Sequence, residues 1–181
     1  MAAGTIARKA DHWFVLLDVN GDGQVQRSDM RALGERILNH FGQSPDSPQG
    51  RKLLQAYDES WDYMVNAMDT DGDNAISREE FRNYMSKNAN RANADEALRP
   101  LTDAEFAVTD TDSDGYLSPD EYAEFLRAWG LSDQDARLGA SSIDTDRDGR
   151  ISREEYFRAC RDFFAGGENL SEPAGQVFGR V

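Results

Sequence analysis

Apolar residues recur every three or four positions before and after four short polar segments of this chain. Met30, Leu33 and Ile37 follow the first segment at this spacing, and Tyr122 and Phe125 follow the third. Such spacing is typical of amphipathic helices, whose apolar faces must be buried against one another. The pattern therefore predicts an all-α protein whose helices share one apolar core.

The four polar segments are built alike and span residues 18–29, 69–80, 110–121 and 144–155. Each has Asp or Asn at positions 1, 3 and 5, Gly or Asn at position 6, an aliphatic residue at position 8 and an acid at position 12. This is the pattern of the EF-hand calcium loop. Four matches in register, each with helical flanks, favour calcium loops over solvated acidic turns.

The chemistry of Ca²⁺ explains the spacing, because this hard cation takes six to eight oxygen ligands at about 2.3–2.6 Å. Positions 1, 3 and 5 supply side-chain oxygens, position 7 supplies a backbone carbonyl, and position 12 supplies one or two carboxylate oxygens after the sharp turn at position 6. The predicted metal ligands are Asp18, Asn20, Asp22, Gln24, Asp29, Asp69, Asp71, Asp73, Ala75, Glu80, Asp110, Asp112, Asp114, Tyr116, Glu121, Asp144, Asp146, Asp148, Arg150 and Glu155.

Position 8 of each loop predicts how the loops pair. Val25, Ile76, Leu117 and Ile151 are apolar residues that can join two neighbouring loops in a short antiparallel ladder. We therefore expect two EF-hand pairs packed into one compact body. Residues 1–90 would form the N-terminal pair, and residues 91–181 the C-terminal pair with a C-terminal tail.

Capping signals and linkers complete the predicted layout. Three loops read Ser-x-x-Glu at positions 9 to 12, a capping box that starts the next helix, and Thr102 with Glu105 forms a similar motif. Residues 42–50 contain Pro45 and Pro48 and predict a linker, as do residues 88–100. These breaks argue against a dumbbell with one long central helix.

The first loop differs in two ligands. Asn20 replaces an acid at position 3, and Asp29 replaces Glu at position 12, which shortens that side chain by one methylene. Fewer ligand oxygens suit the octahedral geometry of Mg²⁺ better. We expect three to four Ca²⁺ ions in all, with the first loop either open to Mg²⁺ or a weak Ca²⁺ site.

The net charge of −14, from 34 acidic and 20 basic residues, belongs mostly to the loops. Fifteen of the acidic residues lie at positions 1, 3, 5 and 12 of the four loops. The rest of the chain has 19 acidic and 20 basic residues and is therefore nearly neutral. The acidity disfavours nucleic acid and anionic membrane as partners. The single cysteine, Cys160, and an N-terminus without an apolar run predict a cytoplasmic protein, which we expect to be a monomer.

The chain resembles the sarcoplasmic calcium-binding proteins and their bacterial relative calerythrin. The resemblance rests on four hands with a long first interval, on Asp29, on the stretch 128–131 (Ala-Trp-Gly-Leu), and on Phe163-Phe164 before a tail with Pro173. It implies two EF-hand pairs packed face to face around a large core, a tail folded back on the body, and a cytosolic Ca²⁺ and Mg²⁺ buffer. That family often has a degenerate second hand, whereas the second loop here keeps its ligands.

Three functions follow from the same motifs. The leading hypothesis is a Ca²⁺/Mg²⁺ buffer or modulator with a closed core. The first alternative is a calcium sensor that exposes a groove to a target helix, for which Met30, Met64, Met68 and Met85 are candidates in the N-terminal half. The second is a carrier of a luciferin-type ligand, in the manner of the photoproteins. We expect no enzymatic activity, because His12, His40 and Cys160 have no readable catalytic partners.

Overall fold

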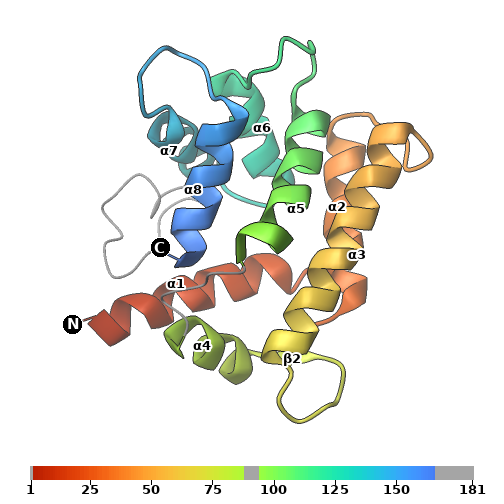
Figure 1. Ribbon diagram of the computed structural model, residues 1–181, viewed down its shortest axis with the longest axis vertical. Helices are drawn as coiled ribbons and strands as arrows, with labels where there is room; N and C mark the ends of the chain where they lie inside the picture. The colour runs from red at the N-terminus through yellow and green to blue at the C-terminus, as the bar shows by residue number, and fades with distance from the viewer. Residues whose placement is uncertain (1, 88–93, 166–181) are drawn as a thin grey trace.

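A computed structural model describes residues 2–87 and 94–165 of the chain. In this part the chain forms an all-α body with one short two-stranded antiparallel sheet (Figure 1). Its elements are α1 (Ala2–Leu17), β1 (Gln24–Val25), α2 (Arg27–His40), α3 (Pro48–Met68), β2 (Ile76–Ser77), α4 (Arg78–Lys87), α5 (Ala94–Thr109), α6 (Pro119–Ala128), α7 (Asp133–Ile143) and α8 (Arg153–Ala165). The predicted fold class is therefore confirmed.

Two helices flank each loop, and the loops pair as position 8 predicts. Val25 in β1 lies opposite Ile76 in β2 in an antiparallel register. Leu117 and Ile151 form the matching bridge, with two backbone N–H···O=C bonds of 2.8 Å between them. All four side chains are buried. Each ladder thus fixes two loops side by side and anchors the pair to the core.

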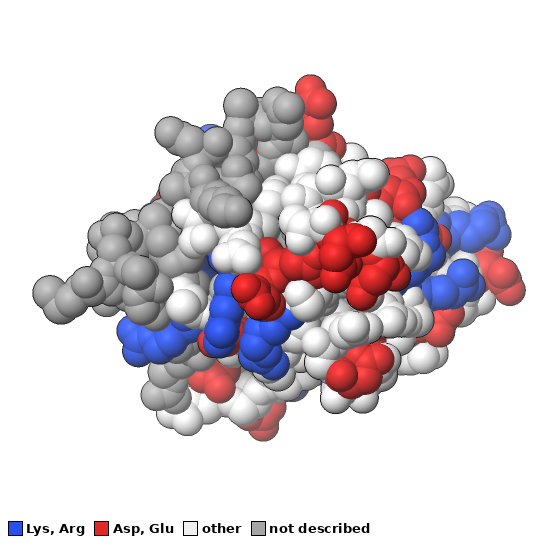
Figure 2. All heavy atoms as spheres, turned by 90° about the horizontal axis from the view of Figure 1, so that it is seen from below, with Lys and Arg blue, Asp and Glu red and all other residues white. Residues whose placement is uncertain are grey.

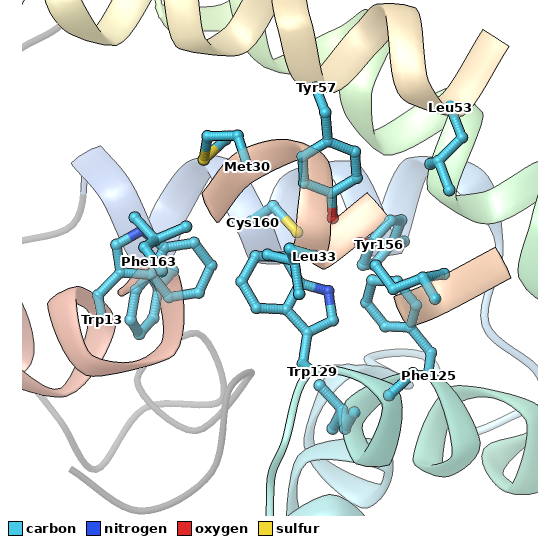
Figure 3. Packing of buried hydrophobic residues seen from close by; sticks show 14 of the residues in the cluster. Trp13, Met30, Leu33, Leu53, Tyr57, Phe125, Trp129, Tyr156, Cys160 and Phe163 are labelled. Atoms are coloured by element: carbon cyan, nitrogen blue, oxygen red, sulfur yellow. The ribbon is translucent and has the colours of Figure 1, made fainter. Parts of the chain in front are cut away.

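The two EF-hand pairs share one core. Trp13 in α1 stacks on Trp129, which directly follows α6, with ring centroids 4.9 Å apart. Phe163 in α8 packs against the same Trp13 ring at 5.5 Å (Figure 3). In addition, α3 packs along α5 from the other half. The protein therefore has no central spacer in its described part, as the linkers predict.

The turn between α2 and α3 depends on a close backbone approach. Ser47 caps α3 by accepting a hydrogen bond from the Gly50 N–H at 2.9 Å, and Pro48 occupies the first turn. A Cβ atom at Gly50 would collide with the backbone carbonyl of Ser44. Position 50 therefore requires glycine, because any other residue would place a Cβ atom against the Ser44 carbonyl.

The predicted start of the third hand is wrong. Helix α5 begins at Ala94 and runs through Pro100, so residues 94–100 are helical where a linker was expected. The hydroxyl of Thr102 donates to the carbonyls of Leu98 and Arg99 in the preceding turn and caps no helix. The Glu105 side chain is buried in the core. A capping motif in sequence cannot reveal that the helix has already begun.

Two further observations concern the chain as a whole. Among the described residues, no helix is both long and apolar enough to cross a bilayer. The prediction that the tail packs back on the body falls on residues 166–181, which lie outside the described residues. The division into pairs at residue 90 stays a prediction.

Candidate metal centres

The sixth residue of each loop turns the chain sharply, as predicted. Gly23 has a φ of 88° and Asn74 a φ of 63°, in the left-handed region that Gly and Asn adopt most readily. The turn directs the Gly23 N–H onto Asp18 Oδ2 at 3.0 Å, and the Asn74 N–H onto Asp69 Oδ2 at 3.0 Å. Equivalent bonds join Gly115 to Asp110 and Gly149 to Asp144.

The carboxylates of three loops converge. In the second loop, one oxygen from each of Asp69, Asp71 and Asp73 lies within 4.8 Å of the other two. Two oxygens on one Ca²⁺ ion are at most about 5 Å apart when each is about 2.3–2.6 Å from it, so this spacing fits Ca²⁺. The groups in the third and fourth loops contain position 12 instead of position 5: Asp110, Asp112 and Glu121, and Asp144, Asp146 and Glu155. Glu80, at position 12 of the second loop, lies outside the group of three.

One oxygen in the third loop has no hydrogen-bond donor beside it. Asp110 Oδ1 is buried and accepts no hydrogen bond from any residue in the described part of the chain. A buried carboxylate oxygen without a partner is costly unless a positive charge compensates it. The residues present therefore fit a bound divalent cation.

The glutamates at position 12 are held at both oxygens. Glu80 Oε1 accepts from the Thr70 N–H at 2.7 Å, and Oε2 accepts from the Ser77 N–H at 2.9 Å. Burial raises the pKa of Glu80, but these backbone bonds and the hydroxyls of both residues outweigh it and lower the pKa to about 2. Glu121 and Glu155 are bonded alike, and their pKa values are lowered for the same reasons. All three are therefore ionised at neutral pH.

The bonds at Ser77 also confirm the predicted capping boxes. The Glu80 N–H donates to Ser77 Oγ at 3.3 Å, while the Ser77 N–H donates to the Glu80 carboxylate. The pair of Ser118 with Glu121 starts α6 in the same way, and the pair of Ser152 with Glu155 starts α8. One side chain thus begins the helix and presents its carboxylate to the loop.

The first loop is arranged differently. Asp29 is 1% exposed, and its two oxygens accept from the N–H groups of Asn20 at 3.2 Å and Gln26 at 3.0 Å. The Asn20 amide donates to Asp22 Oδ2 at 3.0 Å, so these two side chains contact each other. Among the described residues, no group of three converging carboxylates includes a member of this loop. The predicted difference in its ligands therefore extends to its geometry.

Several other predicted ligands lie outside the groups of three, and their binding of metal stays a prediction. The carboxylates of Asp22, Asp114 and Asp148 accept from the N–H at position 7 at 2.8–2.9 Å, as does Asp73. These bonds fix the backbone of Gln24, Ala75, Tyr116 and Arg150, the position expected to ligate through its carbonyl.

Sequence reasoning missed the role of the second residue in the last three loops. The hydroxyls of Thr70, Thr111 and Thr145 donate to the position-12 glutamate at 2.7–2.9 Å, in addition to the N–H bonds of the same residues. The repeated Asp-Thr-Asp of the last three loops was the available signal. These threonines position the glutamate rather than bind metal.

Acidic and basic side chains both lie on the face of the molecule seen from below in Figure 1. The lower end of the molecule carries α4 and the second loop (Figure 1). There, acidic side chains form patches with basic side chains beside them (Figure 2).

Paired helix–loop–helix units with converging carboxylates define an EF-hand calcium-binding protein. Residues 8–86 and 99–161 match the family described as EF-hand domain pair, and the chain belongs to this family.

The chain is 25% identical over 169 residues to calerythrin of Saccharopolyspora erythraea, covering 92% of this chain and 93% of calerythrin. It is 26% identical to the sarcoplasmic calcium-binding protein beta chain of Penaeus sp. over 111 residues, covering 59% and 58% of the two chains. A solved Streptomyces coelicolor calcium-binding protein, studied as a basis for prokaryotic calcium-mediated regulation, is 31% identical with a TM-score of 0.79. That match covers 88% of this chain and 98% of the other. The chain is thus similar to calerythrin and the sarcoplasmic calcium-binding proteins.

Proposed function

We propose that the protein is a Ca²⁺/Mg²⁺ buffer or modulator that binds ions at its four EF-hand loops. The observation that carries the proposal is the convergence of three carboxylates in each of the last three loops, with Asp110 Oδ1 buried and unpaired in the described structure. The relatives named above are calcium-binding proteins, which supports the same role.

The last three loops would each take one Ca²⁺ ion. Position 12 favours this assignment, because hydrogen bonds from backbone N–H groups hold both carboxylate oxygens of Glu80, Glu121 and Glu155 at the end of the loop. A prearranged ligand loses little conformational entropy on binding. The first loop would bind Mg²⁺ or bind Ca²⁺ weakly, because Asn20 is neutral and Asp29 reaches less far. The total is three to four ions.

A closed core supports buffering over sensing. The four methionines considered for a groove, Met30, Met64, Met68 and Met85, are all buried. Aromatic residues from both halves pack α1 against the end of α6 and against α8. A sensor would have to separate these contacts to expose a groove. We also propose a cytoplasmic monomer without a nucleic-acid partner; this part rests on the charge and the cysteine usage of the sequence alone.

Calorimetric titration with Ca²⁺, with and without millimolar Mg²⁺, tests the proposal. For a buffer we expect three or four Ca²⁺ sites, and Mg²⁺ should compete with Ca²⁺ for at least one of them. A hydrophobic dye should bind little to the protein after Ca²⁺ addition. A large Ca²⁺-specific rise in dye fluorescence would establish the sensor alternative instead. If the titration showed no measurable heat of Ca²⁺ binding, both the buffer and the sensor hypotheses would be refuted.

Substitutions at two neighbouring glutamates test the assignment of the metal ligands. Glu155→Gln should remove one tight Ca²⁺ ion from the stoichiometry, because Glu155 faces the fourth loop. The matched control is Glu154→Gln, since the neighbouring Glu154 is exposed and pairs with Arg99 and Arg158. An unchanged stoichiometry in Glu155→Gln, or an equal loss in both variants, contradicts the assignment.

A further inference from the structure

The side chain at the second position of each loop separates the first loop from the other three. This position holds Thr70, Thr111 and Thr145 in the last three loops and Val19 in the first loop. The last three loops end in glutamate at position 12, whereas the first loop ends in Asp29. In this chain a hydroxyl at position 2 thus occurs together with a glutamate at position 12.

In the fourth loop, four hydrogen bonds hold the carboxylate of Glu155. Its Oε1 atom accepts from the Thr145 N–H at 3.0 Å and from the Thr145 hydroxyl at 2.9 Å. Its Oε2 atom accepts from the Ser152 N–H at 2.9 Å and from the Ser152 hydroxyl at 2.8 Å. One of the Glu155 oxygens also lies within 4.8 Å of oxygens of Asp144 and Asp146. Rotation of the carboxylate would therefore break bonds at both of its oxygens.

The third loop repeats this arrangement. The Thr111 hydroxyl donates to Glu121 Oε1 at 2.7 Å, beside the bond from the N–H of the same residue. Glu121 also belongs to a group of three converging carboxylates. Thr70 bonds to Glu80 in the same way, but Glu80 lies outside the group of three in the second loop. The hydroxyl and the converging glutamate therefore occur together in the third and fourth loops.

The first loop holds its last carboxylate with fewer donors. Among the described residues, the N–H groups of Asn20 and Gln26 donate to the two oxygens of Asp29. Val19 has no hydroxyl that could add a bond from position 2. The orientation of this carboxylate is therefore fixed by backbone donors alone.

Ca²⁺ and Mg²⁺ make different demands on position 12. Ca²⁺ takes six to eight oxygens at about 2.3–2.6 Å and accepts both oxygens of a glutamate at this position. Mg²⁺ requires nearly ideal octahedral geometry at about 2.0–2.1 Å. The two oxygens of one carboxylate are closer together than neighbouring octahedral positions, so Mg²⁺ favours a carboxylate that has turned to present one oxygen. A bond that resists this turn therefore disfavours Mg²⁺.

We propose that the hydroxyls of Thr111 and Thr145 are selectivity determinants, which favour Ca²⁺ over Mg²⁺ in the third and fourth loops by holding the position-12 glutamate at the oxygen that would have to turn away. A hydrogen bond to a charged group is among the stronger ones in proteins, so its loss on rotation is significant. This inference rests on the proposed function, because it requires that these loops bind the two ions.

Thr145→Val in the full chain tests the inference, because it removes the hydroxyl and keeps the shape of the side chain. The N–H of Gly149 bonds to Asp144, so its NMR resonance reports occupancy of the fourth loop. The Ca²⁺ midpoint is measured in solutions of buffered free Ca²⁺, and the Mg²⁺ midpoint by adding Mg²⁺ alone. Ca²⁺ affinity should fall about three- to tenfold, because the freed carboxylate must be ordered on binding. Mg²⁺ affinity should change by less than about twofold, since Mg²⁺ gains nothing from this orientation.

Two control variants separate selectivity from a general disturbance of the loop. Thr145→Ser keeps the hydroxyl and should restore the preference for Ca²⁺. Ser141→Ala removes a hydroxyl that bonds to the Leu138 carbonyl in α7, and it should leave both affinities unchanged. Equal losses of Ca²⁺ and Mg²⁺ affinity in Thr145→Val would overturn the inference, as would an unchanged ratio of the two. If Gly149 of the unaltered protein showed no response to Ca²⁺, the proposed function would fail and this inference with it.

Amide hydrogen exchange in the ion-free protein gives a second readout, which needs no metal. The N–H of residue 145 donates to Glu155, and without the hydroxyl the carboxylate should leave this N–H more often. After correction for intrinsic rates, this amide should exchange about threefold faster or more in Thr145→Val than in Thr145→Ser. Equal protection in both variants overturns the inference. Should Thr145→Val not fold, Thr111→Val repeats the titrations in the third loop, with Gly115 as the reporter.

Discussion

Burial of Glu105 makes a specific prediction about how stability depends on pH. Burial raises the pKa of Glu105 to about 7 in the folded protein, against an ordinary value of 4.5 for glutamate. Between these values the folded state keeps a proton that the unfolded state has lost. The stability contributed by Glu105 is therefore greatest below pH 4.5 and falls as the pH rises to about 7.

The magnitude follows from the pKa difference. A difference of about 2.5 pH units at 1.36 kcal/mol per unit amounts to about 3 kcal/mol between pH 4.5 and pH 8. Glu105→Gln keeps the shape of the side chain and carries no charge at any pH. Its amide oxygen can accept from one of the two tyrosine hydroxyls, and its NH₂ group can donate to the other hydroxyl oxygen. The free energy of unfolding of this variant should therefore rise relative to the unaltered protein by about 3 kcal/mol over this range.

Urea unfolding in excess CaCl₂, followed by circular dichroism at several pH values, measures the difference. Groups other than Glu105 titrate in both proteins and cancel in the comparison. Glu96→Gln, on an exposed position of α5, should follow the unaltered protein at every pH. Parallel curves for Glu105→Gln and the unaltered protein, within about 0.5 kcal/mol, would refute the assignment of a raised pKa to Glu105.

Three further predictions concern the loops and the fold. Asp29→Glu restores a methylene at position 12, so calorimetry should show tighter Ca²⁺ binding in the first loop and weaker Mg²⁺ competition. Chelation of Ca²⁺ should lower the melting temperature, because a ligand at 1,000 times its Kd stabilises the folded state by about 4 kcal/mol; a melting temperature indifferent to chelator contradicts the site assignment. Gly50→Ala should destabilise the protein by about 1–3 kcal/mol in urea unfolding, because its Cβ collides with the Ser44 carbonyl, whereas Gln49→Ala should change little.

The local features of this protein follow from short stretches of sequence. The twelve-residue spacing placed the turn at Asn74, the capping bond of Ser118 with Glu121, and the pairing of Leu117 with Ile151, and the structure has each of them. Such features depend on residues a few positions apart or on repetition of one pattern, which periodicity and spacing record directly.

Sequence reasoning failed where a short motif could be read in two ways. Thr102 and Glu105 match a capping box, yet α5 has begun eight residues before Thr102 and continues through Pro100. Glu105 then lies on the buried face of α5, where Tyr57 and Tyr156 bond to it. Neither tyrosine is near Glu105 in the sequence, so no local signal distinguishes a helix cap from a buried carboxyl.

The sequence by itself determined four EF-hand loops, the helices around them, and their pairing, because bonds within each loop and its adjoining helix ends are set by neighbouring residues. Only the tertiary structure decided that Trp13 stacks on Trp129 across the two pairs and that Glu105 is buried between tyrosines from both halves. These arrangements arise from how eight amphipathic helices in the described residues fill a shared volume, and packing of that kind depends on the shapes of side chains far apart in the chain.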